Sequence, residues 1–190
     1  MEHLSQPEIV ERAKRLLLEG RDDEFLAFTE EAVESMPEDP EIRLLYATAL
    51  LPFRPDNVAW EAATAIKLDP DNPWRLVRAA SLLFHRGEID AARSYVGRAA
   101  QLAPSGFEFA PELAHLGGRI AAIDGDRDLA EESLRAALEA EPDRPEFARD
   151  LAQFLCDQDR CDEARDVVDS SLSVNPRDRE LNQLRHRLAG

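Results

Sequence analysis

Aromatic residues are scarce in this sequence, at 6% of 190 residues, although 44% of the residues are hydrophobic. Alanine and leucine are abundant instead. A core of small and medium aliphatic side chains suits closely packed helices better than it suits a sheet. The composition therefore predicts an all-α protein with enough apolar surface for a core.

Long apolar runs are also missing. The N-terminal stretch carries charges throughout, and its longest apolar run is Leu16–Leu18. A membrane-spanning helix needs about 20 apolar residues, and the apolar part of a signal peptide needs about 7–15. We therefore expect neither segment, and we expect a cytoplasmic location.

Positive charge is in deficit, with 23 basic against 39 acidic residues and a formal net charge of -16. Such a surface repels polyanions and anionic membranes, so a general nucleic-acid or membrane-surface binder is disfavoured. Lysine is almost absent: only Lys14 and Lys67 occur, and the other basic residues are arginines. This bias fits either GC-rich coding or adaptation to salt.

Residues with catalytic or metal-binding chemistry are few. Cys156 and Cys161 lack the two-residue spacing of redox or zinc pairs, which predicts two reduced thiols. No Gly-rich phosphate loop, nucleophile elbow or HExxH motif occurs. His85 and His115 could pair near a carboxylate such as Asp124, but this is a weak case for catalysis. We expect no enzyme activity, no metal and no cofactor.

Helix-ending prolines recur at a nearly constant interval, with spacings of 33, 34, 38 and 34 residues. Mostly small residues recur with the same steps at two further positions, one before each proline and one in the preceding helix. The prolines are Pro37, Pro70, Pro104, Pro142 and Pro176; the two columns are Ala32, Ala65, Ala99, Ala137 and Ser171, and Ala13, Tyr46, Ala80, Gly118 and Ala152. Each unit is thus predicted to hold two helices that cross at small residues.

This pattern resembles the tetratricopeptide repeat, a helical hairpin of about 34 residues with small residues in both helices and a proline at its end. The resemblance is strongest in 73–106, in which 79–104 read AASLLFHRGEIDAARSYVGRAAQLAP, and in 111–144; in both, a glycine-acid turn joins the helices. It implies one domain, 1–190, folded as a right-handed α-solenoid with a C-terminal capping helix. The expected segments are units 6–38, 39–72, 73–106, 111–144 and 145–178, and a capping helix at 179–190.

One unit departs from the pattern at its central turn, where 39–72 reads LLPFRPDN. Pro52 and Pro55 should end the first helix early, because proline cannot continue a helix interior. Asp56 or Asn57 is then expected to cap the next helix.

Two further segments depart from the regular array. Four extra residues bring Phe107 and Phe109 into a loop between units, where we expect them to pack over helix ends rather than face a partner. The terminal helix places Leu181, Leu184 and Leu188 on one face, so it is expected to cover the last unit.

Several basic and aromatic residues are predicted to line the exposed face of the first helices, which the resemblance assigns to a concave groove. They are Arg43, Trp74, Arg78, Phe84, His85, His115, Arg119, Arg149 and Gln153. Arg78 and Arg119 have no acid three or four residues away, where a helix would pair them. Guanidinium groups bind carboxylates bidentately, so this band predicts a carboxylate-bearing ligand.

An alternative for the arginines is pairing with acids of the next repeat, such as Glu112, Glu146 or Asp150. Trp74 and Phe84 could likewise be core residues rather than ligand contacts. The lysine and asparagine positions of the chaperone-tail clamp known in this family are not matched here. The resemblance therefore implies a protein-interaction scaffold for an extended or helical, acidic segment of another protein.

Self-association is the second hypothesis for function. The first unit begins with an apolar set that has no evident cap, formed by Ile9, Val10, Ala13, Leu16 and Leu17. A terminal repeat with an uncovered apolar face could pair with another copy of the chain. A homo-oligomer is therefore the alternative to a scaffold for other proteins.

Overall fold

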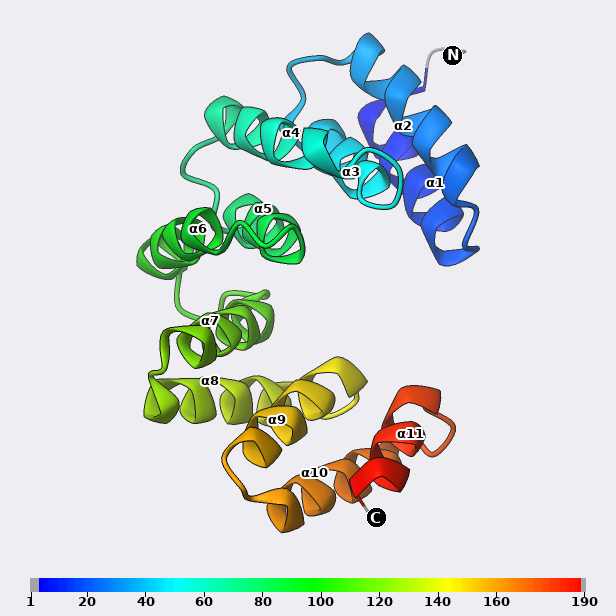
Figure 1. Ribbon diagram of the computed structural model, residues 1–190. Coiled ribbons are helices and arrows are strands. Elements are labelled where there is room, and N and C mark those ends of the chain that lie inside the picture. The colour runs from blue at the N-terminus through cyan, green and yellow to red at the C-terminus, as the bar shows by residue number, and fades with distance from the viewer. Residues whose placement is uncertain (1–3, 189–190) are drawn as a thin grey trace. The chain divides into compact units, whose positions relative to one another are not determined.

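The computed structural model describes residues 4–188, and over these residues every regular element is an α-helix (Figure 1). This confirms the all-α prediction. In chain order the helices are α1 (Gln6–Leu18), α2 (Asp22–Ser35), α3 (Pro40–Leu50), α4 (Pro55–Leu68), α5 (Pro73–His85), α6 (Ile89–Leu102), α7 (Ala110–Asp124), α8 (Arg127–Ala140), α9 (Pro145–Asp157), α10 (Cys161–Val174) and α11 (Arg179–Leu188).

Consecutive helices form antiparallel pairs, whose first members we call A helices (α1, α3, α5, α7, α9) and whose second members we call B helices (Figure 1). Each pair falls within one predicted unit, except that α7 begins one residue before 111. The chain divides into two compact units between Ala103 and Pro104. A single domain over 1–190 therefore stays a prediction.

Prolines and short polar side chains set where helices begin. The Asp39 carboxylate accepts hydrogen bonds from the backbone N–H groups of two first-turn residues of α3, at 2.9 and 3.0 Å. The cap predicted for α4 is wrong, because the helix begins at Pro55 and its N-cap is Arg54. Proline has the φ of a first helical residue and lacks the N–H that would need a cap, so Asp56 and Asn57 lie inside the first turn.

Left-handed residues end several A helices. Gly125 closes α7 with φ of 81°, and Asp159 takes the same role after α9 with φ of 62°. Behind Asp159, the backbone N–H of Arg160 donates to the carbonyl of Leu155 at 2.9 Å. This is the hydrogen bond of a Schellman turn, and aspartate tolerates the left-handed region better than most residues do.

The core of the first three helices is built from aliphatic side chains and two phenylalanines. Ile9, Ala13 and Leu16 of α1 are buried against Phe25 and Phe28 of α2, and against α3. Phe25 occupies a position that holds a small residue in the regular units, and its side chain fills the space beside α1. The apolar face of α1 is therefore largely covered within its own chain.

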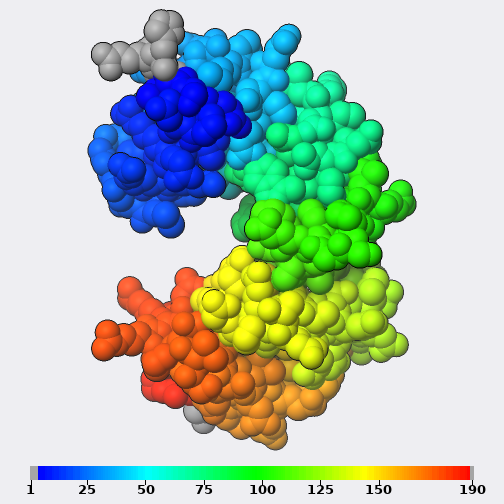
Figure 2. All heavy atoms as spheres, turned by 180° about the vertical axis from the view of Figure 1, so that it is seen from behind, coloured from blue at the N-terminus to red at the C-terminus, as the bar shows by residue number. Residues whose placement is uncertain are grey.

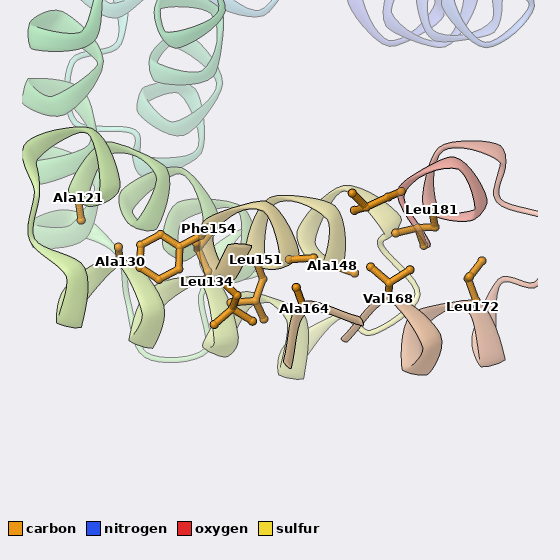
Figure 3. Packing of buried hydrophobic residues seen from close by; sticks show 13 residues of the cluster. Ala121, Ala130, Leu134, Ala148, Leu151, Phe154, Ala164, Val168, Leu172 and Leu181 are labelled. Carbon is orange, nitrogen blue, oxygen red and sulfur yellow. The ribbon is translucent and has the colours of Figure 1, made fainter. Parts of the chain in front are cut away.

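The second compact unit has a continuous core from α7 to α11. Figure 3 shows Leu134 and Leu151 side by side, with Val168 and Leu181 farther along the same layer. In the space-filling view the yellow atoms of α9 lie against the orange atoms of α10 without a gap (Figure 2).

The last described helix covers the end of this core. Leu181 and Leu184 of α11 are buried, and Leu188 packs against the same cluster. The capping helix was predicted over 179–190; α11 accounts for Arg179–Leu188, and 189–190 lie outside the described residues. The charged side chains of α11 remain on its solvent side, as a terminal helix requires.

Candidate functional site

In the first compact unit, Arg78 of α5 is held between an acid and an aromatic ring. Its Nη1 lies 2.7 Å from an Oε of Glu41 on α3, and its guanidinium carbon lies 4.8 Å from the ring centre of Trp74. The Glu41 carboxylate is buried, whereas Arg78 is partly exposed. The guanidinium is therefore fixed in place with one side toward solvent.

Arg43 of α3 is much less accessible than the sequence predicted. Its side chain is 13% exposed, and its Nη1 donates to an Oε of Glu61 on α4 at 2.6 Å. Its Nε donates to the carbonyl of Pro37 at 2.7 Å, and the exposed ring of Trp60 lies beside its guanidinium. Its donors are directed at these groups, so Arg43 acts mainly in holding the α3–α4 pair together and is poorly placed to contact a ligand.

Phe84 and His85 end α5. The Phe84 ring is half-buried and meets the His85 ring edge-to-face, with 6.4 Å between their centres. The exposed His85 places Nδ1 2.8 Å from the carbonyl oxygen of Ser81. Both residues belong to the first compact unit, whereas His115 belongs to the second.

In the second compact unit, His115 of α7 is buried against α9. Its Nε2 lies 2.9 Å from an Oδ of Asp150, and its ring stacks on Phe147 with 4.5 Å between centres. Arg119, one turn along α7, reaches the same carboxylate with Nε at 3.2 Å. Burial tends to raise the pKa of Asp150, but the hydrogen bond from His115 and the positive charges of Arg119 and Arg149 outweigh it and lower that pKa.

The outer part of α9 carries two further predicted residues. Arg149 pairs with Glu180 of α11 and lies 3.6 Å from an Oδ of Asp150 through Nε; at 39% exposed it is the most accessible of the predicted arginines. Gln153 is exposed and donates to Asp157 at 2.8 Å. Both side chains therefore remain reachable from solvent.

The arginines of the predicted band are all paired, which corrects the expectation drawn from their own helices. Arg78 and Arg119 do lack an acid three or four residues away, but each meets a carboxylate from the neighbouring A helix. Of the acids considered from sequence, Asp150 plays this part. Glu112 and Glu146 pair with Arg144 instead.

Sequence reasoning missed the buried acids Glu41 and Glu61 and the exposed ring of Trp60. The signal for Glu41 was present in the repeat itself. Partners lie 37 residues apart in the pair of Glu41 with Arg78, and 35 in the pair of His115 with Asp150, close to one repeat length. A search for acids one repeat away from Arg78 would have found Glu41.

The residues behind the self-association hypothesis are mostly buried. Ile9, Ala13 and Leu16 belong to the core, Val10 is half-buried against it, and only Leu17 is exposed. The two phenylalanines of the inter-unit loop, Phe107 and Phe109, are half-buried and pack on each other with 5.9 Å between ring centres.

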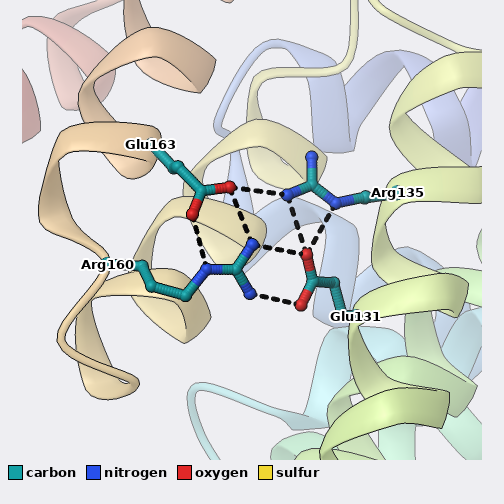
Figure 4. A network of polar contacts seen from close by, with 4 residues as sticks. All are labelled: Glu131, Arg135, Arg160 and Glu163. Atoms are coloured by element: carbon teal, nitrogen blue, oxygen red, sulfur yellow. Dashed lines mark hydrogen bonds and ion pairs between the residues drawn. The ribbon is translucent and has the colours of Figure 1, made fainter.

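An ion-pair network joins α8, α10 and the turn before α10 (Figure 4). Arg160 lies between two carboxylates, donating to Glu131 at 2.5 and 2.9 Å and to Glu163 at 2.6 and 2.7 Å. Arg135 pairs with the same two acids. The hydrogen bonds from Arg160, with help from Arg135, lower the pKa of Glu131 to about 2.

Residues 121–188 match the family model of the tetratricopeptide repeat. The match runs from the end of α7 through α11, over the helices whose cores and turns are described above. This part of the chain is therefore similar in sequence to the tetratricopeptide repeat. Comparison with curated proteins finds no match.

Solved structures show the same fold over nearly the whole length of the chain. A thermophilic tetratricopeptide-repeat protein of Thermus thermophilus is 24% identical with a TM-score of 0.82, and the alignment covers 97% of this chain and 99% of the other. PilF of Pseudomonas aeruginosa is 17% identical with a TM-score of 0.74, covering 95% and 81%. PilW, a type IV pilus biogenesis factor, is 18% identical with a TM-score of 0.77, covering 91% and 80%. The fold is that of an α-solenoid.

This fold supports a general role as a protein-interaction scaffold, and proteins of the family are typically scaffolds rather than catalysts. Within residues 4–188, no three histidine, cysteine or acidic side chains gather as a metal site would require. Cys156 and Cys161 are free thiols. None of the described helices is long and apolar enough to cross a membrane.

Proposed function

We propose that the chain is a cytoplasmic scaffold that binds an acidic, partly apolar segment of another protein on the faces of its A helices. The observation that carries this proposal is the pairing of Arg78 with Glu41 and Trp74 on α5. An arginine already held in position loses less side-chain entropy on binding than a mobile one does. Its outer N–H groups can still bind a carboxylate beside an aromatic wall.

A second contact region is proposed on α9, where Arg149 and Gln153 are exposed. Arg149 is reached by Glu180 and Asp150, so a ligand carboxylate would share the guanidinium with these acids or replace the exposed Glu180. Exchange of one surface ion pair for another costs little, because such pairs are worth about 0–1 kcal/mol.

The structure changes how this proposal must be tested. Replacing Arg78 by glutamate would set two carboxylates against each other at a buried position, so lost binding could simply reflect unfolding. The double variant Arg78→Gln with Glu41→Gln removes both charges and keeps neutral side chains of similar size. The probe is fluorescein-labelled EEFEEFEE, followed by fluorescence anisotropy at low and moderate salt.

We expect the double variant to weaken binding of this peptide about tenfold or more, since a hydrogen bond to a charged group is worth about 1.5–3 kcal/mol. Arg149→Gln should weaken it less. Arg93→Gln is the matched control, because Arg93 pairs with Asp90 on the B helix α6 and should leave binding unchanged. Equal binding of EEFEEFEE and the neutral QQFQQFQQ, or equal affinity of all variants, would refute recognition of acidic groups.

A further inference from the structure

A hollow of about 270 Å³ lies on the B helices of the second compact unit, between α8 and α10. Its walls are mainly apolar, and one carboxylate reaches them. Its walls include Leu138, Pro142, Asp166, Val167, Ser171 and Val174. We call this the Ser171 hollow.

Ser171 is the unusual residue of the hollow. It is only 4% exposed, and its hydroxyl oxygen has no hydrogen-bond partner among the described residues. In the other four units the equivalent position holds an alanine, as at Ala137, and these alanines are fully buried. Burying a hydroxyl without a partner is unfavourable, because the hydrogen bonds that it made with water are not replaced. The last unit therefore carries a polar atom where its fold requires only a methyl group.

The charge around the hollow indicates what would satisfy that hydroxyl. The helices α8 and α10 together carry eight acids and three arginines. Within residues 4–188 no basic side chain pairs with Asp166, although neighbouring acids such as Glu131 and Asp162 are paired. A surface of this kind attracts cations and repels carboxylates.

We propose that the Ser171 hollow binds the side chain of a lysine presented by a basic segment of a partner protein. A lysine has a long apolar stem and a compact ammonium group with three donors. The stem fits along Leu138, Val167 and Val174, while the ammonium donates to the hydroxyl of Ser171 and to the carboxylate of Asp166. This site lies on the B helices and does not depend on the acidic ligand proposed for the A helices.

The first test uses a small mimic of the lysine side chain. Isotope-labelled full-length protein is titrated with n-butylammonium chloride, and the backbone and methyl NMR signals are followed. We expect saturable shifts at Leu138, Val167, Ser171 and Val174. The neutral n-butanol should bind about tenfold more weakly, because it lacks the charge that Asp166 accepts, and butyrate should give no shifts there. Equal shifts with n-butanol, or shifts centred elsewhere, would overturn the proposal.

Variants then assign the two polar contacts. Ser171→Ala restores the residue of the other four units, so it should fold normally while weakening n-butylammonium binding several-fold. Asp166→Asn should weaken binding as well. Ser173→Ala is the matched control, because this exposed hydroxyl donates to the carbonyl of Ser170 on the same helix. Unchanged binding to Ser171→Ala would remove the basis of the proposal.

A peptide test separates a protein ligand from a free amine. The peptide acetyl-LKL-amide should compete with n-butylammonium for the same signals, and the version with norleucine in place of lysine should not. Norleucine keeps the stem and removes the ammonium group. Failure of the lysine peptide to compete would overturn the assignment of a protein segment as the ligand.

Discussion

Gly118 is predicted to be the residue on which packing of α7 against α8 depends most directly. A Cβ added at this position would lie 2.9 Å from Cγ of Leu134, and 3.1 Å from both the carbonyl oxygen of Ala130 and the backbone nitrogen of Leu134. Two of these three atoms belong to the backbone of α8, which cannot turn aside as a flexible side chain can. The substitution Gly118→Ala must therefore separate the helices.

The magnitude follows from two opposing effects. Alanine in place of glycine inside a helix is worth about 0.5–1 kcal/mol in favour of folding. Extra volume in a tightly packed core typically costs about 1–3 kcal/mol. We expect Gly118→Ala to lose about 1–2 kcal/mol of unfolding free energy. Gly97→Ala in α6 is the matched control: no atom lies within 4 Å of its new Cβ, so it should gain up to about 1 kcal/mol.

The assay is urea unfolding followed by circular dichroism, with amide hydrogen exchange to locate the change. In Gly118→Ala the amides of α7 and α8 should lose protection before those of α1 and α2, since repeats are coupled mainly to their neighbours. The reasoning is refuted if Gly118→Ala is as stable as Gly97→Ala. That result would mean that α7 and α8 do not approach as closely as described.

Two further predictions concern ion pairs. The pKa of Glu131 is about 2 in the folded protein against an ordinary value of 4.5, so the stability that its ionised form contributes is present above about pH 4.5 and is lost as the pH falls toward 2. Glu131→Gln should lower the unfolding free energy at pH 7 by about 1–2 kcal/mol after allowing for solvent screening. It should also flatten the acid side of a curve of unfolding free energy against pH. Arg43→Met should lower the free energy of urea unfolding by about 3–5 kcal/mol, because it leaves Glu61 buried and unpaired. The double variant Arg43→Met with Glu61→Met should have an unfolding free energy near that of the parent. A single variant as stable as the parent would contradict the buried pairing.

The helix pairs could be predicted from sequence because their boundaries are set by local chemistry. Pro40 and Pro73 begin A helices, Gly87 and Gly125 end them, and the small side chain of Ala99 marks a crossing point. Each of these residues acts through its own backbone or its own volume. Such effects can be predicted without knowing which residues far apart in the sequence come into contact.

The candidate site was predicted less well because its residues act through distant partners. The search for acids compared Arg78 only with residues on its own helix, whereas its partner Glu41 lies on another A helix. The burial of Arg43 was missed for the same reason, because its partner Glu61 lies on the following helix. The carboxylates that lie beside these arginines were therefore not foreseen.

The spacing of these partners also bears on how such a chain can evolve. Glu41 with Arg78 and His115 with Asp150 join positions about one repeat apart. Adding or removing a whole repeat outside the two repeats that hold a pair leaves that acid and base at the same distance. Inserting one residue within an A helix instead rotates the following residues of that helix by about 100° about its axis, which separates the acid from its base. Recombination in whole repeats is therefore the change that these pairs tolerate, and shifts of register within a helix are the change that they oppose.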